Sequence, residues 1–351
     1  MKKTFSILVL ISASFIFSGC SLSGTTSTPA GPLANATMIK SVDGGVAWQP
    51  KIKIDDKKTI AGVDVLSMAI DPVDSNIVYI GTMANGIFVS KDGAETWAQI
   101  PLADKIYNIV FDPQNHDIMY ASGVLNGRAK IFKRLSANEQ WKEVYTEPAD
   151  GTVITSLAIN KVNSRVLFAG TINGVIVKTT DGGLTWANIK KATGPVTGIV
   201  FDSSDDQHLF FAVFQIGLLE TKDGGKTIED IAQKIDATQH VSSVFAVAAD
   251  PSVGGVFYVG TGSGIFKKTG SSDTWEAVNI IESSKAFPIR AFAVSPMNPK
   301  EIMYSSSHAI YKSVDGGASW ATFQLDSAKE ISVLKYDKSN SLKIYAGLRK
   351  Y

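Results

Sequence analysis

Residues 41–48 read Ser-Val-Asp-Gly-Gly-Val-Ala-Trp, and variants of this eight-residue stretch return along the chain. Further close copies lie at 90–97, 179–186, 221–228 and 313–320, and two degraded copies that keep the tryptophan lie at 133–141 and 267–275. Successive copies are separated by 42 to 49 residues. Self-similarity at such a period predicts a repeat architecture.

The residue types of the stretch explain why it recurs. Aspartate has a short side chain that accepts hydrogen bonds from backbone N–H groups of its own turn, and glycine allows positive φ in a tight hairpin. Tryptophan is a large apolar body that packs between neighbouring sheets. We therefore expect structural rather than catalytic roles for Asp43, Asp92, Asp181, Asp223, Asp315, Trp48, Trp97, Trp186 and Trp320.

The pattern Ser/Thr-x-Asp-x-Gly-x-Thr-Trp resembles the Asp-box, also called the BNR repeat. Asp-boxes occur in sialidases, in the sortilin luminal domain, in some exo-acting glucanases and in photosystem II assembly factors. Five good copies and two degraded ones stand in register, and the resemblance covers residues from about 37 to 351.

A second landmark recurs once in each repeat. A short apolar strand runs into a turn, often Asp-Pro, and then into a strand that ends near Gly-Thr, as at 67–82. Together with the Asp-box hairpin, each repeat supplies four strands, A to D, with the Asp-box in the C–D turn. Four-stranded sheets repeated radially form a β-propeller. We predict an all-β, seven-bladed propeller over residues 37–351, with about 45 residues per blade.

The phase of the repeat predicts how the ring closes. The repeats begin with a C–D hairpin at 38–50 and end with an A–B pair at 332–348. Neither half makes a blade alone. We expect the two halves to form the seventh blade together, which removes two open sheet edges.

The first 36 residues have a different composition from the repeats. Lys2 and Lys3 precede an apolar run at 5–17, a pattern typical of a signal peptide over residues 1–19. Residues 17–20, Phe-Ser-Gly-Cys, resemble a bacterial lipobox, and Cys20 is the single cysteine of the chain. The alternative is an ordinary secretory signal with an incidental thiol. Residues 20–36 are predicted to be the lipidated cysteine and a flexible tether.

The lipobox resemblance implies a location. Cys20 would become the acylated N-terminus, and more than one acyl chain anchors a protein stably to a membrane. We expect a lipoprotein on the exported side of the cell envelope, at the outer membrane if the bacterium has two membranes.

Charge and histidine content argue against several classes of partner. The net charge is +1, so no strong field is available to attract nucleic acid. The four histidines are dispersed, without paired metal-ligand spacing, and no phosphate loop or Gly-x-Ser-x-Gly elbow stands in suitable context. We therefore predict no metal, no cofactor and no nucleic acid.

The loops between blades supply the candidate binding residues. Because blade strands are antiparallel, the D–A and B–C loops share the face opposite the Asp-boxes, where ligand chemistry is most easily placed. Each residue alone also fits a solvated loop position. The candidates are Asp55, Asp56, Met83, Asn85, Asn126, Arg128, Glu147, Asp150, Asn173, Gln215, His240, Arg290 and His308. Arg128 is the first candidate, because it lies in what we expect to be the longest B–C loop, and Arg290 is the second.

An enzymatic function is tested on the same residues. A sialidase resemblance would imply three arginines around a carboxylate, but only Arg128 and Arg290 are expected on this face. Residues 287–290, Phe-Pro-Ile-Arg, hold the letters of the sialidase Phe-Arg-Ile-Pro motif in the wrong order. Exo-glucanases with these repeats use two propellers, whereas one is predicted here. We assign no catalytic residue, and two loop carboxylates at glycosidase separation remain an alternative.

The resemblance to photosystem II assembly factors is strongest in length, blade number and lipoprotein-like start. It implies a monomeric, envelope-anchored scaffold that binds a protein or peptide partner, for example in assembling a membrane complex. The alternative is a glycan-binding or glycan-cleaving surface protein.

The anchor prediction is tested by Cys20→Ser. Without the thiol no acyl chain can be attached, so we expect the variant to lose fatty-acid labelling and to leave the membrane fraction. Unchanged partitioning into detergent would contradict the lipobox interpretation.

Overall fold

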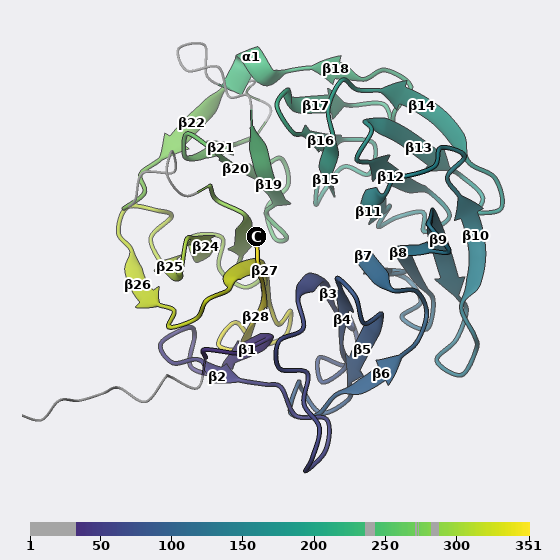
Figure 1. Cartoon of the computed structure of the whole chain (residues 1–351). Coiled ribbons are helices and arrows are strands. Elements are labelled where there is room, and N and C mark those ends of the chain that lie inside the picture. The colour runs from purple at the N-terminus through teal and green to yellow at the C-terminus, as the bar shows by residue number, and fades with distance from the viewer. Residues whose placement is uncertain (1–32, 236–242, 271, 273, 282–287) are drawn as a thin grey trace, which may run out of the picture.

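The computed structural model describes residues 33–235, 243–270, 272, 274–281 and 288–351 (Figure 1). Its 28 strands form seven four-stranded antiparallel sheets arranged in a ring. In the described part of the chain, helix is limited to α1 (Ala232–Ile235). The predicted all-β, seven-bladed propeller is confirmed.

Six blades are continuous in sequence, and each runs from its innermost strand, next to the central channel, to its outermost. Blade 1 consists of β3 (Val65–Ile70), β4 (Val78–Thr82), β5 (Ile87–Ser90) and β6 (Ala98–Ile100). Blade 2 consists of β7 (Lys105–Phe111), β8 (Met119–Leu125), β9 (Arg128–Arg134) and β10 (Lys142–Thr146). Blade 3 consists of β11 (Ile154–Ile159), β12 (Leu167–Thr171), β13 (Val175–Thr179) and β14 (Ala187–Lys191). Blade 4 consists of β15 (Val196–Phe201), β16 (Leu209–Val213), β17 (Gly217–Thr221) and β18 (Glu229–Asp230). Blade 5 consists of β19 (Val244–Ala249), β20 (Phe257–Thr261), β21 (Ile265–Lys268) and β22 (Trp275–Val278). Blade 6 consists of β23 (Ala291–Val294), β24 (Ile302–Ser306), β25 (Ala309–Ser313) and β26 (Ala321–Gln324).

Blade 7 joins the two ends of the repeat region. From the channel outward it consists of β27 (Glu330–Tyr336), β28 (Ile344–Arg349), β1 (Met38–Ser41) and β2 (Gln49–Pro50). Strands β1 and β28 pair antiparallel from Met38↔Gly347 to Ser41↔Ile344. The predicted closure is therefore present, and the edges of β1 and β28 that face each other at the seam are paired.

The packed part of the chain begins earlier than the predicted boundary at residue 37. Leu33 and Ala36 are buried in the hydrophobic cluster that also holds Trp48 and Ile344. Thr37 donates its hydroxyl to the carbonyl oxygen of Ile60 at 2.6 Å. The tether prediction for 20–36 is wrong at its last four residues, because Leu33 and Ala36 have apolar side chains that the seam of the ring can bury.

The Asp-box of a blade is fixed to the A–B turn of the same blade. In each of the five good copies, a box glycine donates its backbone N–H to a carbonyl oxygen in that turn, at 2.8 or 2.9 Å. The pairs are Gly44 with Leu342, Gly93 with Asn76, Gly182 with Arg165, Gly224 with Gln207 and Gly316 with Lys300. Both turns thus share one surface, which we call the Asp-box face, and the opposite surface is the loop face.

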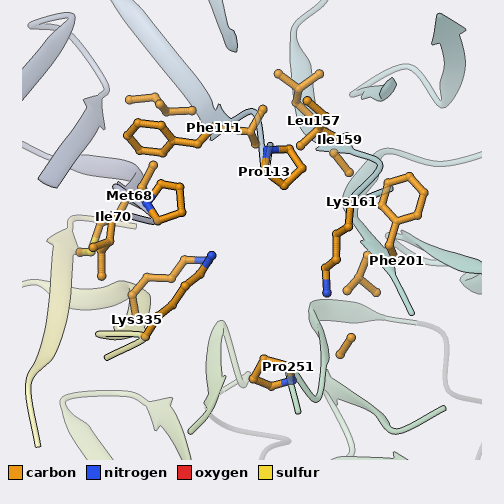
Figure 2. Close-up of a pocket in the computed structure, with 18 of the residues that line it drawn as sticks. Met68, Ile70, Phe111, Pro113, Leu157, Ile159, Lys161, Phe201, Pro251 and Lys335 are labelled. Atoms are coloured by element: carbon orange, nitrogen blue, oxygen red, sulfur yellow. The ribbon is translucent and has the colours of Figure 1, made fainter. Parts of the chain in front are cut away.

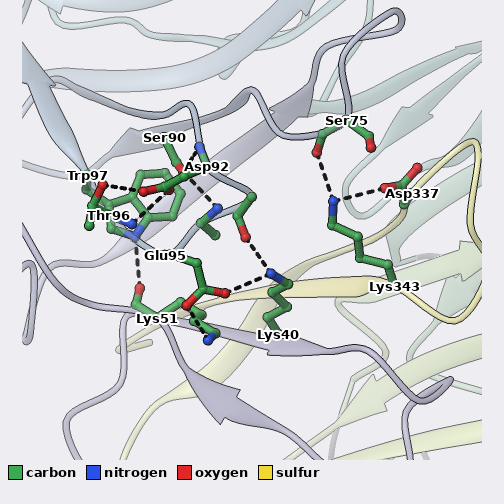
Figure 3. A network of polar contacts seen from close by, with 12 residues as sticks. Lys40, Lys51, Ser75, Ser90, Asp92, Glu95, Thr96, Trp97, Asp337 and Lys343 are labelled. Carbon is green, nitrogen blue, oxygen red and sulfur yellow. Dashed lines mark hydrogen bonds and ion pairs between the residues drawn. The ribbon is translucent and has the colours of Figure 1, made fainter.

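Lysines tie neighbouring blades together on the Asp-box face. The next-to-last residue of a C strand donates its ammonium group to a box carbonyl oxygen of the following blade, at 2.6 to 3.0 Å. The pairs are Lys40 with Gly93, Lys133 with Gly182, Lys178 with Gly224 and Lys312 with Gly44. Lys40 also pairs with Glu95 at 2.9 Å (Figure 3). In these four cases the contact runs from the C strand of one blade to the Asp-box of the next.

The box tryptophans pack in the reverse direction, against the preceding blade. Trp97 is 2 % exposed and donates its indole N–H to the carbonyl oxygen of Lys51 at 2.9 Å. Trp320 bonds Asn279 in the same way at 2.7 Å. The interface between blades 7 and 1 thus combines the buried ring of Trp97 with the charge-assisted hydrogen bond from Lys40 to the carbonyl oxygen of Gly93.

Within residues 33–351, leaving out the ranges that are not described, no helix reaches the length and apolar content needed to cross a bilayer.

The seam is tested by deleting residues 332–351. This removes β28 and most of β27 and leaves β1 with an open edge, so we expect insoluble protein or loss of cooperative thermal unfolding. Deleting only residues 350–351 keeps every strand and should leave the melting temperature near that of the parent. A soluble monomer that lacks 332–351 yet melts like the parent would contradict the role of the seam.

Candidate ligand-binding mouth of the central channel

The inner strands line a central channel that opens on both faces. Near the loop face, where the inner strands begin, the channel widens into a cavity of about 250 Å3, the loop-end cavity. Polar groups from five blades line it: Asn108, Ser156, Thr197, Arg290 and Ser332. Hydroxyl, amide and guanidinium groups converge there on one space, an arrangement typical of a ligand site.

Arg290 has the most elaborate surroundings in this cavity. It precedes β23, and its guanidinium carbon lies 4.0 Å from the centre of the Tyr351 ring and 5.5 Å from that of Phe245. Its Nε lies 3.4 Å from a carboxylate oxygen of Glu330. The Arg290 side chain is 28 % exposed, so the guanidinium is held in place but still reachable by a ligand.

The C-terminal residues complete the mouth. The chain ends at the middle of the ring (Figure 1). Arg349 is paired with Glu330 in the sheet, and its guanidinium carbon lies 3.9 Å from the centre of the Tyr351 ring. Phe245 meets Phe214 edge to face, with 5.6 Å between ring centres. The mouth therefore offers two guanidinium groups beside exposed or half-buried aromatic rings.

Arg128 does not belong to this mouth. The predicted long B–C loop is wrong: β8 and β9 are long strands joined by the two-residue turn Asn126-Gly127, with φ of 54° and 73°. Asn-Gly is the preferred pair for such a turn, so the sequence signal was present. Arg128 forms an ion pair with Asp150 at 3.0 Å and donates to the carbonyl oxygens of Glu147 and Pro148.

The remaining candidates are spread around the loop face. Glu147 is buried and accepts a hydrogen bond from the Tyr145 hydroxyl at 2.8 Å. Gln215 lies in the β16–β17 turn directly after Phe214, with φ of 65°. His308 lies in the β24–β25 turn beside Ser307. His240 and Cys20 lie outside the described residues.

Two groups thus emerge from the candidates. Arg128, Glu147 and Asp150 form one next to blade 2, and Arg290 belongs to the other, at the mouth of the channel. Asp55 closes its own turn by accepting the backbone N–H groups of Lys57 and Lys58, and Asp56 pairs with Lys53 at 2.8 Å. Met83 donates its N–H to Asp64, while Asn85 and Asn173 supply carbonyl oxygens to the side chains of Gln99 and Lys191.

The Asp-box carboxylates are occupied by their own turns. Thr185 donates both its hydroxyl and its backbone N–H to Asp181, and Thr179 adds a second hydroxyl at 2.7 Å. These bonds hold the pKa of Asp181 well below its usual range, and the same pattern lowers the pKa of Asp315. A carboxylate that stays ionised in this way is unsuited to donate a proton in catalysis.

Among the residues that the structure describes, no group of three or more His, Cys, Asp and Glu side chains is arranged to hold a metal ion. Of the described residues that line the loop-end cavity, none is an aspartate or a glutamate.

Comparison with known proteins points to two kinds of propeller. The xyloglucanase Xgh74A of Acetivibrio thermocellus is 24% identical over 300 residues, which cover 81% of this chain and 28% of the relative. The GH74 xyloglucanase structure from Xanthomonas campestris superposes with a TM-score of 0.68 and 17% identity, over 81% of this chain and 51% of that chain. YCF48 bound to D1 peptide superposes with a TM-score of 0.61 and 14% identity, over 82% of this chain and 94% of that chain.

These similarities define a class by fold rather than a family. No family model matches the chain. The chain spans less than a third of the length of the curated relatives that it matches. At the identities found, the superposed structures show the seven-bladed propeller, shared with the xyloglucanases and with YCF48.

The structural role predicted for the Asp-box is tested by unfolding. Trp97→Ala should lower the free energy of unfolding by about 3–5 kcal/mol, because a large buried ring is removed. Asp92→Ala should cost less, about 1–2 kcal/mol, since its hydrogen bonds lie near solvent. Lys91→Ala, an exposed position in the same box, is the control. Loss of ligand binding by Asp92→Ala at full stability, measured by urea denaturation and calorimetry, would contradict this role.

Proposed function

We propose that this protein is an envelope-anchored, polysaccharide-binding propeller whose ligand site is the mouth of the channel on the loop face. The lipid anchor at Cys20 belongs to this proposal. The observation that carries it is the convergence of Arg290, Tyr351 and the polar wall of the loop-end cavity, on a chain whose matched relatives act on xyloglucan.

The chemistry of the mouth suits a sugar chain. Sugar rings present hydroxyl groups at their edges and C–H groups on their faces. Asn108, Ser156 and Thr197 donate to backbone carbonyl oxygens, which leaves their side-chain oxygens to accept hydrogen bonds from sugar hydroxyl groups. The aromatic rings of the mouth offer apolar surface to the faces. Few polar groups at fixed positions and a larger apolar surface are the usual features of a small-molecule site.

Binding without cleavage is the function that the geometry supports. Glycoside hydrolysis by the common mechanism needs two carboxyl groups on either side of the scissile bond. Glu330 lies beside Arg290, but the loop-end cavity has no carboxylate in its wall. We therefore expect no release of reducing ends from xyloglucan.

A second candidate function is a peptide-binding scaffold. It is favoured by the match to YCF48 bound to D1 peptide, which covers most of both chains. Arg290 and Arg349 at the mouth could bind a carboxylate of such a partner in a bidentate manner. The two candidates predict different ligands at the same site.

The test uses residues 21–351, which retain every strand of the propeller and avoid detergent. Binding of xyloglucan and cello-oligosaccharides is measured by isothermal titration calorimetry. Arg290→Ala and Tyr351→Ala should each weaken binding at least about tenfold, because each removes a contact at the mouth. Arg128→Ala, on the same face but outside the mouth, should bind like the parent.

Absence of binding to all glycans tested, together with Arg290-dependent binding of acidic peptides, would reject the polysaccharide proposal in favour of the scaffold. Release of reducing ends by the parent would instead show that a catalytic pair exists. If Arg128→Ala weakened glycan binding while Arg290→Ala did not, the mouth would be the wrong site.

A further inference from the structure

The Asp-box end of the channel holds a second and larger cavity, of about 500 Å3. Six of the seven blades contribute to its wall, largely with apolar side chains such as Ile70, Phe111 and Phe201. Figure 2 shows these side chains around an open space into which Lys161 and Lys335 project from opposite sides. We call this space the Asp-box-end cavity.

Both lysines depart from the repeat that builds the wall. Two residues before the turn aspartate, six blades carry Ala or Val, as Ala69 and Val110 do, whereas blade 7 carries Lys335. The position after the turn residue is proline in four blades, but it is Lys161 in blade 3 and Lys338 in blade 7. The fold needs no cation at these positions, since other blades form the same turns with apolar residues.

No contact with another described residue explains why lysines stand at these two positions. Among the described residues, neither Lys161 nor Lys335 forms an ion pair or a side-chain hydrogen bond. None of the described residues in the wall of this cavity is an aspartate or a glutamate. The turn aspartates accept hydrogen bonds from backbone N–H groups: Asp202, for example, accepts those of Ser204 in its own turn and of Gly255 in the turn of the next blade.

The surroundings disfavour the cations when the cavity holds only water. Lys161 and Lys335 are exposed to solvent, but the apolar side chains around them lower the pKa of both ammonium groups, and the positive charge of Lys338 lowers it further. Asp202 opposes this effect at Lys161 only in part. Water reaches both side chains through the channel, so a dissolved anion could reach them too. An anion bound between Lys161 and Lys335 would favour the charged form of both side chains.

We propose that the Asp-box-end cavity is a second binding site, for a small organic anion with an apolar body. Lys161 and Lys335 would hold the anionic head, with Lys338 at the rim, and Ile70, Phe111 and Phe201 would pack against the body. The two cavities adjoin along the channel and share Leu157, Ile199 and Lys335, but Arg290 lines only the loop-end cavity and Lys161 only the Asp-box-end cavity.

The test compares decanoate with decanol, which has the same apolar chain without the charge. Calorimetric titration of residues 21–351 should show binding of decanoate in preference to decanol. The double variant Lys161→Met, Lys335→Met keeps the apolar length of both side chains and removes both charges. It should bind decanoate at least about tenfold more weakly. Lys142→Met, at an exposed position of β10, is the matched control and should bind like the parent.

Thermal unfolding without ligand gives an independent readout. If the lysines serve a ligand, removing two crowded cations should leave the melting temperature of the double variant equal to or above that of the parent. A lower melting temperature would assign the lysines to the fold and overturn the proposal.

Equal binding of decanoate and decanol, or no binding of decanoate by the parent, would also overturn it. Arg290→Ala should leave decanoate binding unchanged, so failure of this site can be distinguished from failure of the polysaccharide site.

Discussion

Pairing between β1 and β28 is the constraint on which the rest of the molecule depends. A propeller blade buries its faces only against its two neighbours, so seven blades share seven interfaces only when the ring is closed. Here the closing blade takes strands from both ends of the repeat region, and four residue pairs hold them together. The channel, its two cavities and the C-terminal residues at the mouth keep their positions because this seam holds.

Contacts between blades distinguish the good copies of the Asp-box from the degraded ones. Lys40, Lys133, Lys178 and Lys312 each bond the box of the following blade, and all four of those boxes are good copies. Where the following box is degraded, the corresponding residue is Val89 or Glu220. Glu220 instead pairs with His208 at 2.8 Å inside its own blade. The lysine and the box carbonyl oxygen therefore act as one unit that spans two blades, which a comparison of boxes alone does not reveal.

Sequence reasoning succeeded where the repeat itself determines the structure. Strand order, the position of the Asp-box in the C–D turn and the closing blade follow from spacing that seven copies repeat. It failed where one residue departs from the pattern. The expected long loop at Asn126-Gly127 is a two-residue turn between β8 and β9, although Asn-Gly is a typical hairpin pair. Arg349 and Tyr351 were not assigned to the loop face, because their place at the mouth depends on β28 running back to the centre of the ring. Lys335 lies inside strand β27 and was not among the candidates, because these were chosen from the loops.

The two ends of the channel have the same repeated framework but differ in a few charged residues that are not part of the repeat. Identical turns and apolar strand positions give a wall of fixed radius, and single departures from the pattern place charge on it. At the loop end the charged residue is Arg290, at a position with no common residue type among the blades, and Phe245, Glu330 and Tyr351 surround it. At the Asp-box end it is Lys335, surrounded by apolar neighbours. A half-buried arginine between aromatic rings suits a ligand with hydroxyl or carboxylate groups, whereas a lysine in an apolar wall suits an anion that also has an apolar body. The chemical difference between the two cavities therefore rests on a few residues, while the repeated wall is common to both.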